Sequence, residues 1–120
     1  MRRYKWFKLA EFDSPDKVGS GELMEDVVMQ RLDLARDIYG HPMIISSGFR
    51  TIEHNKSVGG SGSSSHLLGW AVDIHCETSR KRFLMLEALL DAGFSRIGIG
   101  EDFLHVDADP EKSELVIWTY

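Results

Sequence analysis

Hydrophobic positions recur with helical spacing in two parts of the chain. From position 23 to position 39, apolar residues return every three or four positions, which predicts an amphipathic helix that ends at Gly40. The segment 78–93, TSRKRFLMLEALLDAG, predicts a second helix with Thr78 or Ser79 as its N-cap. We therefore expect two helices, each packing one apolar face against a core.

Shorter apolar runs before and after the second helix predict strands. These runs are PMIIS (42–46), GWAVDIHC (69–76), RIGIG (96–100), FLHVDAD (103–109) and ELVIWTY (114–120). Only two residues, Glu101 and Asp102, join the third and fourth runs. The order of helix, strands, helix and strands favours an α+β fold with a small, mainly antiparallel sheet and flanking helices.

Alternation within two of these strands separates apolar from polar side chains. Residues two apart in a strand share a face, so Asp73 and His75 point away from the apolar face of their strand. The same rule places His105 and Asp107 together on one face of a later strand. Each of the two strands is therefore expected to carry a polar pair on one face.

A long polar segment, SGFRTIEHNKSVGGSGSSS, runs from Ser47 to Ser65. Gly/Ser-rich sequence is typical of flexible linkers, but a linker joins domains and this segment interrupts a small one. A structureless loop of this length in a compact domain is more often functional than accidental. We therefore expect target recognition in the loops, especially between Arg50 and Ser65.

Composition limits the number of domains and the class of partner. The 120 residues, 42% of them hydrophobic, suffice for a single domain spanning 1–120. The formal net charge of −5 argues against nucleic acid or an anionic membrane surface as partner, because both require clustered positive charge. The basic residues near the start, which are Arg2, Arg3, Lys5 and Lys8, are interpreted as a solvated terminus.

The chain shows no signal for a membrane or for export. It lacks a run of about 18 apolar residues, so no membrane insertion is expected. Charged residues interrupt the start where a signal peptide needs an apolar stretch, which predicts synthesis in the cytoplasm. Cys76 is the single cysteine, in agreement with a reducing compartment.

His66, Asp73 and His105 are candidate metal ligands. Two imidazoles and a carboxylate with an open fourth position form the ligand set of a hydrolytic zinc site. Spacing alone leaves other interpretations open, because His66 could cap a turn and His105 could face solvent on an edge strand. His75 shares the face of Asp73 and is a rival ligand.

Three separated motifs resemble those of the zinc DD-peptidases in the M15 peptidase superfamily, whose metal-site fold is shared with the Hedgehog signalling domain. SSSHLLGWAVDI (63–74) is similar to the signature S-x-H-x-x-G-x-A-x-D, and SGFRTIEHN (47–55) resembles the family's SG-aromatic-R segment. IGIGEDFLHVDAD (97–109) resembles its terminal histidine strand, and LAEFDSPDKVGSGELM (9–24) is similar to the start of its small single-domain branch. The resemblance implies a Hedgehog/DD-peptidase-like fold.

The same resemblance implies a role for each matching residue. His66, Asp73 and His105 would bind Zn²⁺. Arg50 would help to stabilise the oxyanion and to bind a substrate carboxylate, a task suited to a planar, permanently charged group. The family's general base is usually an acidic residue three positions before the last histidine ligand, a position that Asp102 occupies here.

Two further carboxylates have less defined roles. Glu101 is the alternative to Asp102 as general base, because it is the neighbouring acidic residue. Asp107 could orient His105 by accepting a hydrogen bond from its other ring nitrogen, or it could be a solvated strand residue.

The function implied is that of a zinc metallopeptidase that hydrolyses a peptide bond involving a D-amino acid in bacterial peptidoglycan. Carboxypeptidases and endopeptidases both occur among relatives, and a phage or prophage endolysin acting on the cell wall, in the periplasm or outside the cell, fits this class. The expected partners are peptidoglycan stem peptides, with a monomer as the default state. The alternatives are a catalytically inactive zinc-containing wall-binding module and a phage structural component, and Asp102 is the residue that discriminates between enzyme and module.

Overall fold

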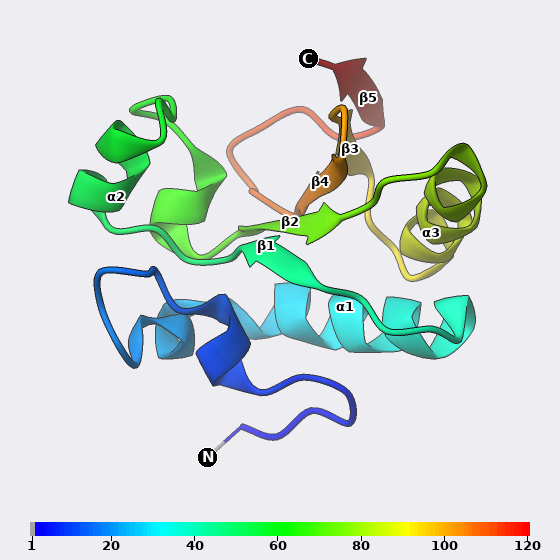
Figure 1. The fold of residues 1–120 in the computed structure, drawn as a ribbon, viewed down its shortest axis with the longest axis horizontal. Helices are drawn as coiled ribbons and strands as arrows, with labels where there is room; N and C mark the ends of the chain where they lie inside the picture. The colour runs from blue at the N-terminus through cyan, green and yellow to red at the C-terminus, as the bar shows by residue number, and fades with distance from the viewer. Residues whose placement is uncertain (1) are drawn as a thin grey trace.

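The computed structural model describes residues 2–120 and combines three helices with a five-stranded sheet (Figure 1). Three short 3-10 turns, η1 to η3, complete the regular structure. The elements in chain order are η1 (Leu9–Phe12), η2 (Ser20–Leu23), α1 (Asp26–Tyr39), β1 (Ile45–Ser47), α2 (Ile52–Ser57), η3 (Ser65–Leu68), β2 (Ala71–His75), α3 (Ser79–Asp91), β3 (Arg96–Ile99), β4 (Phe103–Asp107) and β5 (Val116–Thr119).

Both predicted helices are present, and their ends have the expected chemistry. Gly40 follows α1 with φ of 76°, a left-handed conformation that glycine adopts without steric cost. Thr78 is the N-cap of α3, because its hydroxyl accepts a hydrogen bond from the Lys81 backbone N–H at 3.2 Å. The choice between Thr78 and Ser79 is thereby settled in favour of Thr78.

The sheet has the strand order β1-β2-β4-β3-β5. β1 pairs with β2, β2 with β4, and β4 with β3, all antiparallel, whereas β5 adds to β3 in parallel. The prediction of an α+β fold with a mainly antiparallel sheet is confirmed, with the correction that the last strand makes the sheet mixed. Because β4 is antiparallel to β3, β4 ends beside the start of β3, and residues 108–115 lead from there to β5 on the other side of β3, which makes β5 parallel to β3.

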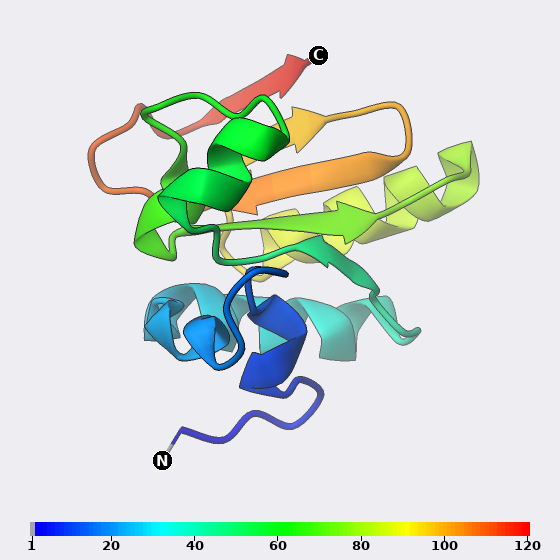
Figure 2. The same ribbon diagram turned by 60° about the vertical axis from the view of Figure 1, so that its left-hand side comes forward.

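Strand alternation divides the sheet into an apolar face and a polar face. Val72 and Ile74 in β2, with Leu104 and Val106 in β4, are fully buried in one hydrophobic core together with residues of α1 and α3. The other face carries Asp73 and lies beneath α2 and the loop that follows it. Figure 2 shows α2 on one side of β4 and α3 on the other. The predicted separation of faces is confirmed.

The Gly/Ser-rich segment is more ordered than its composition suggested. Residues 52–57 form the short helix α2, whose N-cap Thr51 accepts a hydrogen bond from the His54 backbone N–H at 3.1 Å. The Thr51 hydroxyl also donates to the Asp16 carboxylate at 2.6 Å. The expectation of a loop without regular structure was therefore wrong for these residues. The Thr51 cap and its contact with Asp16 stabilise a helix of six residues.

Two of the basic N-terminal residues, Arg2 and Lys5, bind other parts of the protein, whereas Arg3 and Lys8 are exposed. Arg2 donates hydrogen bonds at 2.7 Å to the backbone carbonyls of Met24 and Glu22. Lys5 and the indole N–H of Trp6 both bind the Asp37 carboxylate on α1, at 3.1 and 2.8 Å. The interpretation as a solvated terminus is therefore wrong for Arg2, which is partly buried, whereas Arg3, Lys5 and Lys8 lie exposed at the surface.

Within residues 2–120, no helix combines the length and the apolar character that crossing a bilayer requires.

Candidate metal centre

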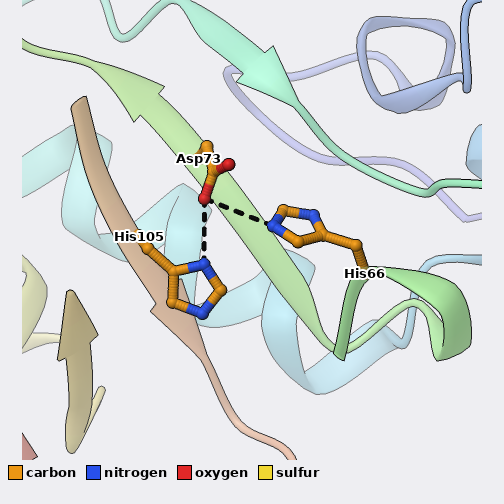
Figure 3. A group of neighbouring side chains, drawn as sticks. All are labelled: His66, Asp73 and His105. Carbon is orange, nitrogen blue, oxygen red and sulfur yellow. Dashed lines mark hydrogen bonds and ion pairs between the residues drawn. The ribbon is translucent and has the colours of Figure 1, made fainter. Parts of the chain in front are cut away.

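Three elements bring the predicted metal ligands together. His66 lies on η3, Asp73 in the middle of β2 and His105 in the middle of β4, where it is the register partner of Asp73. One ligand atom from each residue lies within 4.8 Å of the others, and all three residues are buried. Figure 3 shows the two imidazoles converging on the same carboxylate oxygen. His66 Nε2 is 3.3 Å and His105 Nδ1 is 2.9 Å from Asp73 Oδ1.

The remaining ring nitrogens of both histidines have partners elsewhere in the protein. His66 donates from Nδ1 to the carbonyl of Gly48 at 2.8 Å, and His105 donates from Nε2 to Asp107 Oδ2 at 2.7 Å. Position 48 requires glycine, because a Cβ there would lie 2.7 Å from the Phe12 backbone. Hydrogen bonds of this kind fix the tautomer and ring orientation of metal-binding histidines. Each imidazole therefore presents its other nitrogen to Asp73.

This arrangement fits a cation. With their outer nitrogens protonated, the two neutral imidazoles direct lone pairs at the Asp73 carboxylate, which is also an acceptor, so the three groups need a proton or a metal ion between them. Burial tends to lower the pKa of His105, but hydrogen bonds to Asp107 and Asp73 raise it above its ordinary value. A proton can thus take the place that a metal would fill. Nitrogen and carboxylate ligands in this number suit a catalytic metal site with an open position.

The Asp73 carboxylate is held in its ionised form by its neighbours. Burial tends to raise the pKa of Asp73, yet hydrogen bonds with His105 and His66 bring it well below the usual range. Its second oxygen, Oδ2, accepts from Arg50 Nη2 at 3.2 Å. Asp73 therefore offers a charged oxygen, Oδ1, to the cluster while Oδ2 is fixed by Arg50.

Arg50 is positioned by three contacts at the beginning of α2. Its Nε donates to the Ser47 hydroxyl at 2.9 Å and its Nη1 to the Asn55 side-chain oxygen at 3.2 Å. Together with the Asp73 contact, each of its three nitrogens makes one hydrogen bond, and each terminal nitrogen keeps a second N–H. Arg50 lines the same cavity as the metal cluster, so these N–H groups are placed to reach a ligand there.

A chain of charged groups continues behind His105. Asp107 is 2% exposed and accepts from Arg96 Nε at 2.7 Å as well as from His105. Burial tends to raise the pKa of Asp107, and its hydrogen bonds with His105 and Arg96 lower it on balance. The alternative that Asp107 is a solvated strand residue was wrong. Its contact with His105 is that of a carboxylate orienting a metal ligand.

Replacing Asp107 with asparagine is expected to weaken metal binding by about 10- to 100-fold, the usual effect of losing such a carboxylate. The amide keeps the size of the side chain but removes the charge that accepts from His105. Titration with a competing chromogenic chelator measures the affinity, and Asp91→Asn, an exposed site at the end of α3, is the control. Equal affinities in the two variants would contradict this role.

Segment 108–120 contributes several residues of the site that no sequence pattern had marked. Trp118 packs 5.5 Å from the ring of His105, over Gly98, where a Cβ would lie 2.7 Å from the indole nitrogen. Asp109 is buried and accepts from the Ser65 hydroxyl at 2.7 Å, next to His66. Lys112 donates to Ser65 at 2.8 Å. Alternation in the last strand could have grouped Trp118 with Tyr120, whereas no local signal marks Asp109 or Lys112.

Two adjoining clefts open at the cluster. The first, of about 320 Å³, contains all three candidate ligands and is also lined by Arg50, Gly59, Gly60, Ser61, Ser64, Ser65, Arg96, Phe103, Asp107, Lys112, Trp118 and Tyr120. The second, of about 250 Å³, is lined by Ser46, Ser47, Arg50, His54, Val58, Asp73, His75, Asp102 and Phe103. Arg50, Asp73 and Phe103 form the boundary that the two clefts share. We call them the ligand cleft and the Asp102 cleft.

Of the other candidate residues, Asp102 and His75 line the Asp102 cleft. Asp102 is exposed at the turn before β4 and lines the Asp102 cleft, while the neighbouring Glu101 lines neither cleft. His75 has a side chain that is 39% exposed and lies 3.5 Å from Glu77, so it does not join the metal cluster. His54 also lines the Asp102 cleft.

A family model described as Peptidase M15 matches residues 7–107 of the chain. The match includes the three candidate ligands, Arg50 and Asp102, and ends before the segment that carries Lys112 and Trp118. A search of curated proteins finds none that matches.

Proposed function

The chain belongs to the peptidase M15 family and is therefore a metallopeptidase, and we propose that it uses zinc to hydrolyse a peptide bond involving a D-amino acid in bacterial peptidoglycan. The observation that carries this proposal is the convergence of His66, Asp73 and His105 in an open cleft. The α+β fold with its five-stranded sheet is compatible with an M15 peptidase. Zinc is favoured because imidazole and carboxylate ligands with an open position are those of hydrolytic zinc sites.

His66, Asp73 and His105 would hold the metal, with Gly48 and Asp107 keeping the two imidazoles in place. When bound, zinc supplies Lewis-acid chemistry, which polarises a carbonyl group and makes water nucleophilic near neutral pH. The contribution of the protein is to hold these ligands in a buried, hydrogen-bonded frame before the metal arrives. Such a frame lowers the cost of ordering the site on binding.

Arg50 and Asp102 would carry out the steps that belong to the chain itself. Arg50 is placed to donate its remaining terminal N–H groups to the carbonyl oxygen of the bond being cut, where negative charge develops. Asp102 would accept a proton from the attacking water at its carboxylate and pass it to the leaving amine. In sum, the C–N bond breaks, the carbonyl carbon gains the hydroxyl of water and the nitrogen gains a hydrogen.

The proposed place of action is the bacterial cell wall, after synthesis in the cytoplasm, as for the lysis enzyme of a phage or prophage. Peptidoglycan stem peptides are the proposed partners, and the clefts at the cluster can receive a peptide from solvent. A phage origin and a bacterial wall-remodelling role both fit this proposal. An experiment must identify which peptide bond is cut.

Mass spectrometry of purified peptidoglycan incubated with the zinc-loaded protein tests this function. We expect new fragments that each arise from cleavage of one peptide bond, disappear after treatment of the enzyme with a chelator, and return when zinc is added back. Peptidoglycans of several chemotypes serve as substrates, because the stem and cross-bridge differ between bacteria. A folded, zinc-loaded protein that leaves all of them intact would contradict the proposal.

A further inference from the structure

A buried hydrogen bond joins the turn that carries His66 to the segment that follows β4. The Ser65 hydroxyl donates to Asp109 Oδ2 at 2.7 Å, and these two residues are only 2% and 5% exposed. Lys112 Nζ donates to the Ser65 hydroxyl oxygen at 2.8 Å and to the Ser63 carbonyl at 2.9 Å. The Ser65 hydroxyl therefore has both an acceptor and a donor as partners, and both come from the short segment 109–112.

Asp109 is also connected to the support of the other histidine. Its Oδ1 accepts from the Glu111 backbone N–H at 3.0 Å, so both of its carboxylate oxygens have donors. Its backbone N–H donates to Asp107 Oδ1 at 3.2 Å, and Asp107 Oδ2 accepts from His105. Asp109 thus lies between the carboxylate that orients His105 and the residue that precedes His66.

His66 is the candidate ligand that lies outside the sheet. Asp73 and His105 are paired with each other across β2 and β4, whereas His66 lies on η3, a turn of four residues. The sequence just before it, GGSGSSS (59–65), has the composition of a flexible chain. A ligand that must be ordered when the metal binds weakens binding by the cost of that ordering. The hydrogen bond between Ser65 and Asp109 fixes the beginning of η3 in advance.

We propose that Asp109 is a positioning residue of the metal centre, which acts through Ser65 to hold η3 and the His66 imidazole in place for the ion. Lys112, 3.8 Å from Asp109, balances the charge of this buried carboxylate. The inference rests on the metal site of the proposed function and is independent of the substrate. Segment 109–112 lies beyond the residues 7–107 that the family model matches.

Alanine at Ser65 tests the inference, with Ser63→Ala as the matched control. Ser65→Ala removes the link and leaves Asp109 and Lys112 able to pair directly. The Ser63 side chain is exposed and makes its hydrogen bond within the loop, with the Ser61 hydroxyl at 3.0 Å. Competition with a chromogenic chelator measures Zn²⁺ affinity, and the visible absorption of the Co²⁺-loaded protein reports the arrangement of the ligands.

We expect Ser65→Ala to bind Zn²⁺ about tenfold more weakly than Ser63→Ala, the low end of the effect of residues that support metal ligands. The Co²⁺ absorption of Ser65→Ala should also be weaker, because water then competes with His66 for the ion. Circular dichroism of the metal-free proteins shows whether each variant is folded at the temperature of the titration. A loss of affinity that occurs only in unfolded protein overturns the inference.

A second variant, Asp109→Asn, removes the charge of the acceptor and keeps its size. If Asp109 acts through Ser65, the double variant binds Zn²⁺ no more weakly than the weaker single variant, whereas independent losses would multiply. Losses that multiply overturn the inference, as do affinities and Co²⁺ spectra of Ser65→Ala and Asp109→Asn that equal those of Ser63→Ala. A wild-type protein that binds neither Zn²⁺ nor Co²⁺ instead overturns the proposed metal site itself.

Discussion

Alanine at His66 or His105 is expected to abolish both metal binding and peptidase activity. Each substitution removes one of the three ligands and leaves a site of two, which loses several kcal/mol of transition-state stabilisation, on the order of 10³-fold in rate or more. The folded state should survive in the His105 variant, because Asp73 remains paired with Arg50 and Asp107 with Arg96. Metal content after dialysis, kcat/KM on peptidoglycan fragments and thermal unfolding measure these three properties.

His75→Ala is the matched control for these substitutions. His75 lies on the same face of β2 as Asp73 and was a rival ligand in the sequence, but its side chain is 39% exposed and pairs with Glu77. Removing it should leave the metal content of the protein unchanged and activity within about tenfold of wild type. A His75 variant that loses its metal, or a His66 or His105 variant that keeps it, would show that the ion binds elsewhere.

Strand alternation was sufficient to place Asp73 and His105 on the polar face of the sheet, whereas their role as metal ligands, and that of His66, came from the resemblance to a known family. The period of two in a strand assigns Asp73 and His105 to the polar face whatever the rest of the fold does, because a shift by one residue would bury them in the core. The structure confirms this assignment: Val72 and Leu104 lie in the hydrophobic core, whereas Asp73 and His105 line the ligand cleft. What alternation cannot supply is the register that places Asp73 opposite His105, which depends on pairing between distant strands.

The surroundings of the site depend on contacts that no local pattern encodes. The last strand was predicted, but its parallel pairing with β3 relies on Trp118 lying over Gly98, a fit between residues far apart in the chain. Lys112 and Asp109 lie in an irregular segment and reach Ser65 from the other end of the sequence. The helix α2 was missed because six residues are too few for a hydrophobic period to appear.

Asparagine at Asp102 is expected to lower kcat by about 10²- to 10⁴-fold while the protein keeps its metal. An amide cannot accept the proton of the attacking water, yet it retains the size and hydrogen-bonding capacity of the carboxylate. Because Asp102 is exposed and lies outside the ligand cluster, neither folding nor metal content should change. Stopped assays for kcat, metal analysis and the pH–rate profile of the same samples separate proton transfer from binding.

Glu101→Gln supplies the comparison, since Glu101 is the adjacent acidic residue and lines neither cleft. It should retain nearly full kcat, because its carboxylate has no position beside the bound substrate. If Glu101→Gln loses activity and Asp102→Asn does not, the proton acceptor is Glu101, and the turn before β4 must rearrange when substrate binds. If both variants have the kcat of an active wild type, a group outside this turn accepts the proton from the water. Both side chains are carboxylates, but only Asp102 lines the Asp102 cleft. Comparing the two variants therefore tests whether the acidic residue three positions before His105 accepts the proton.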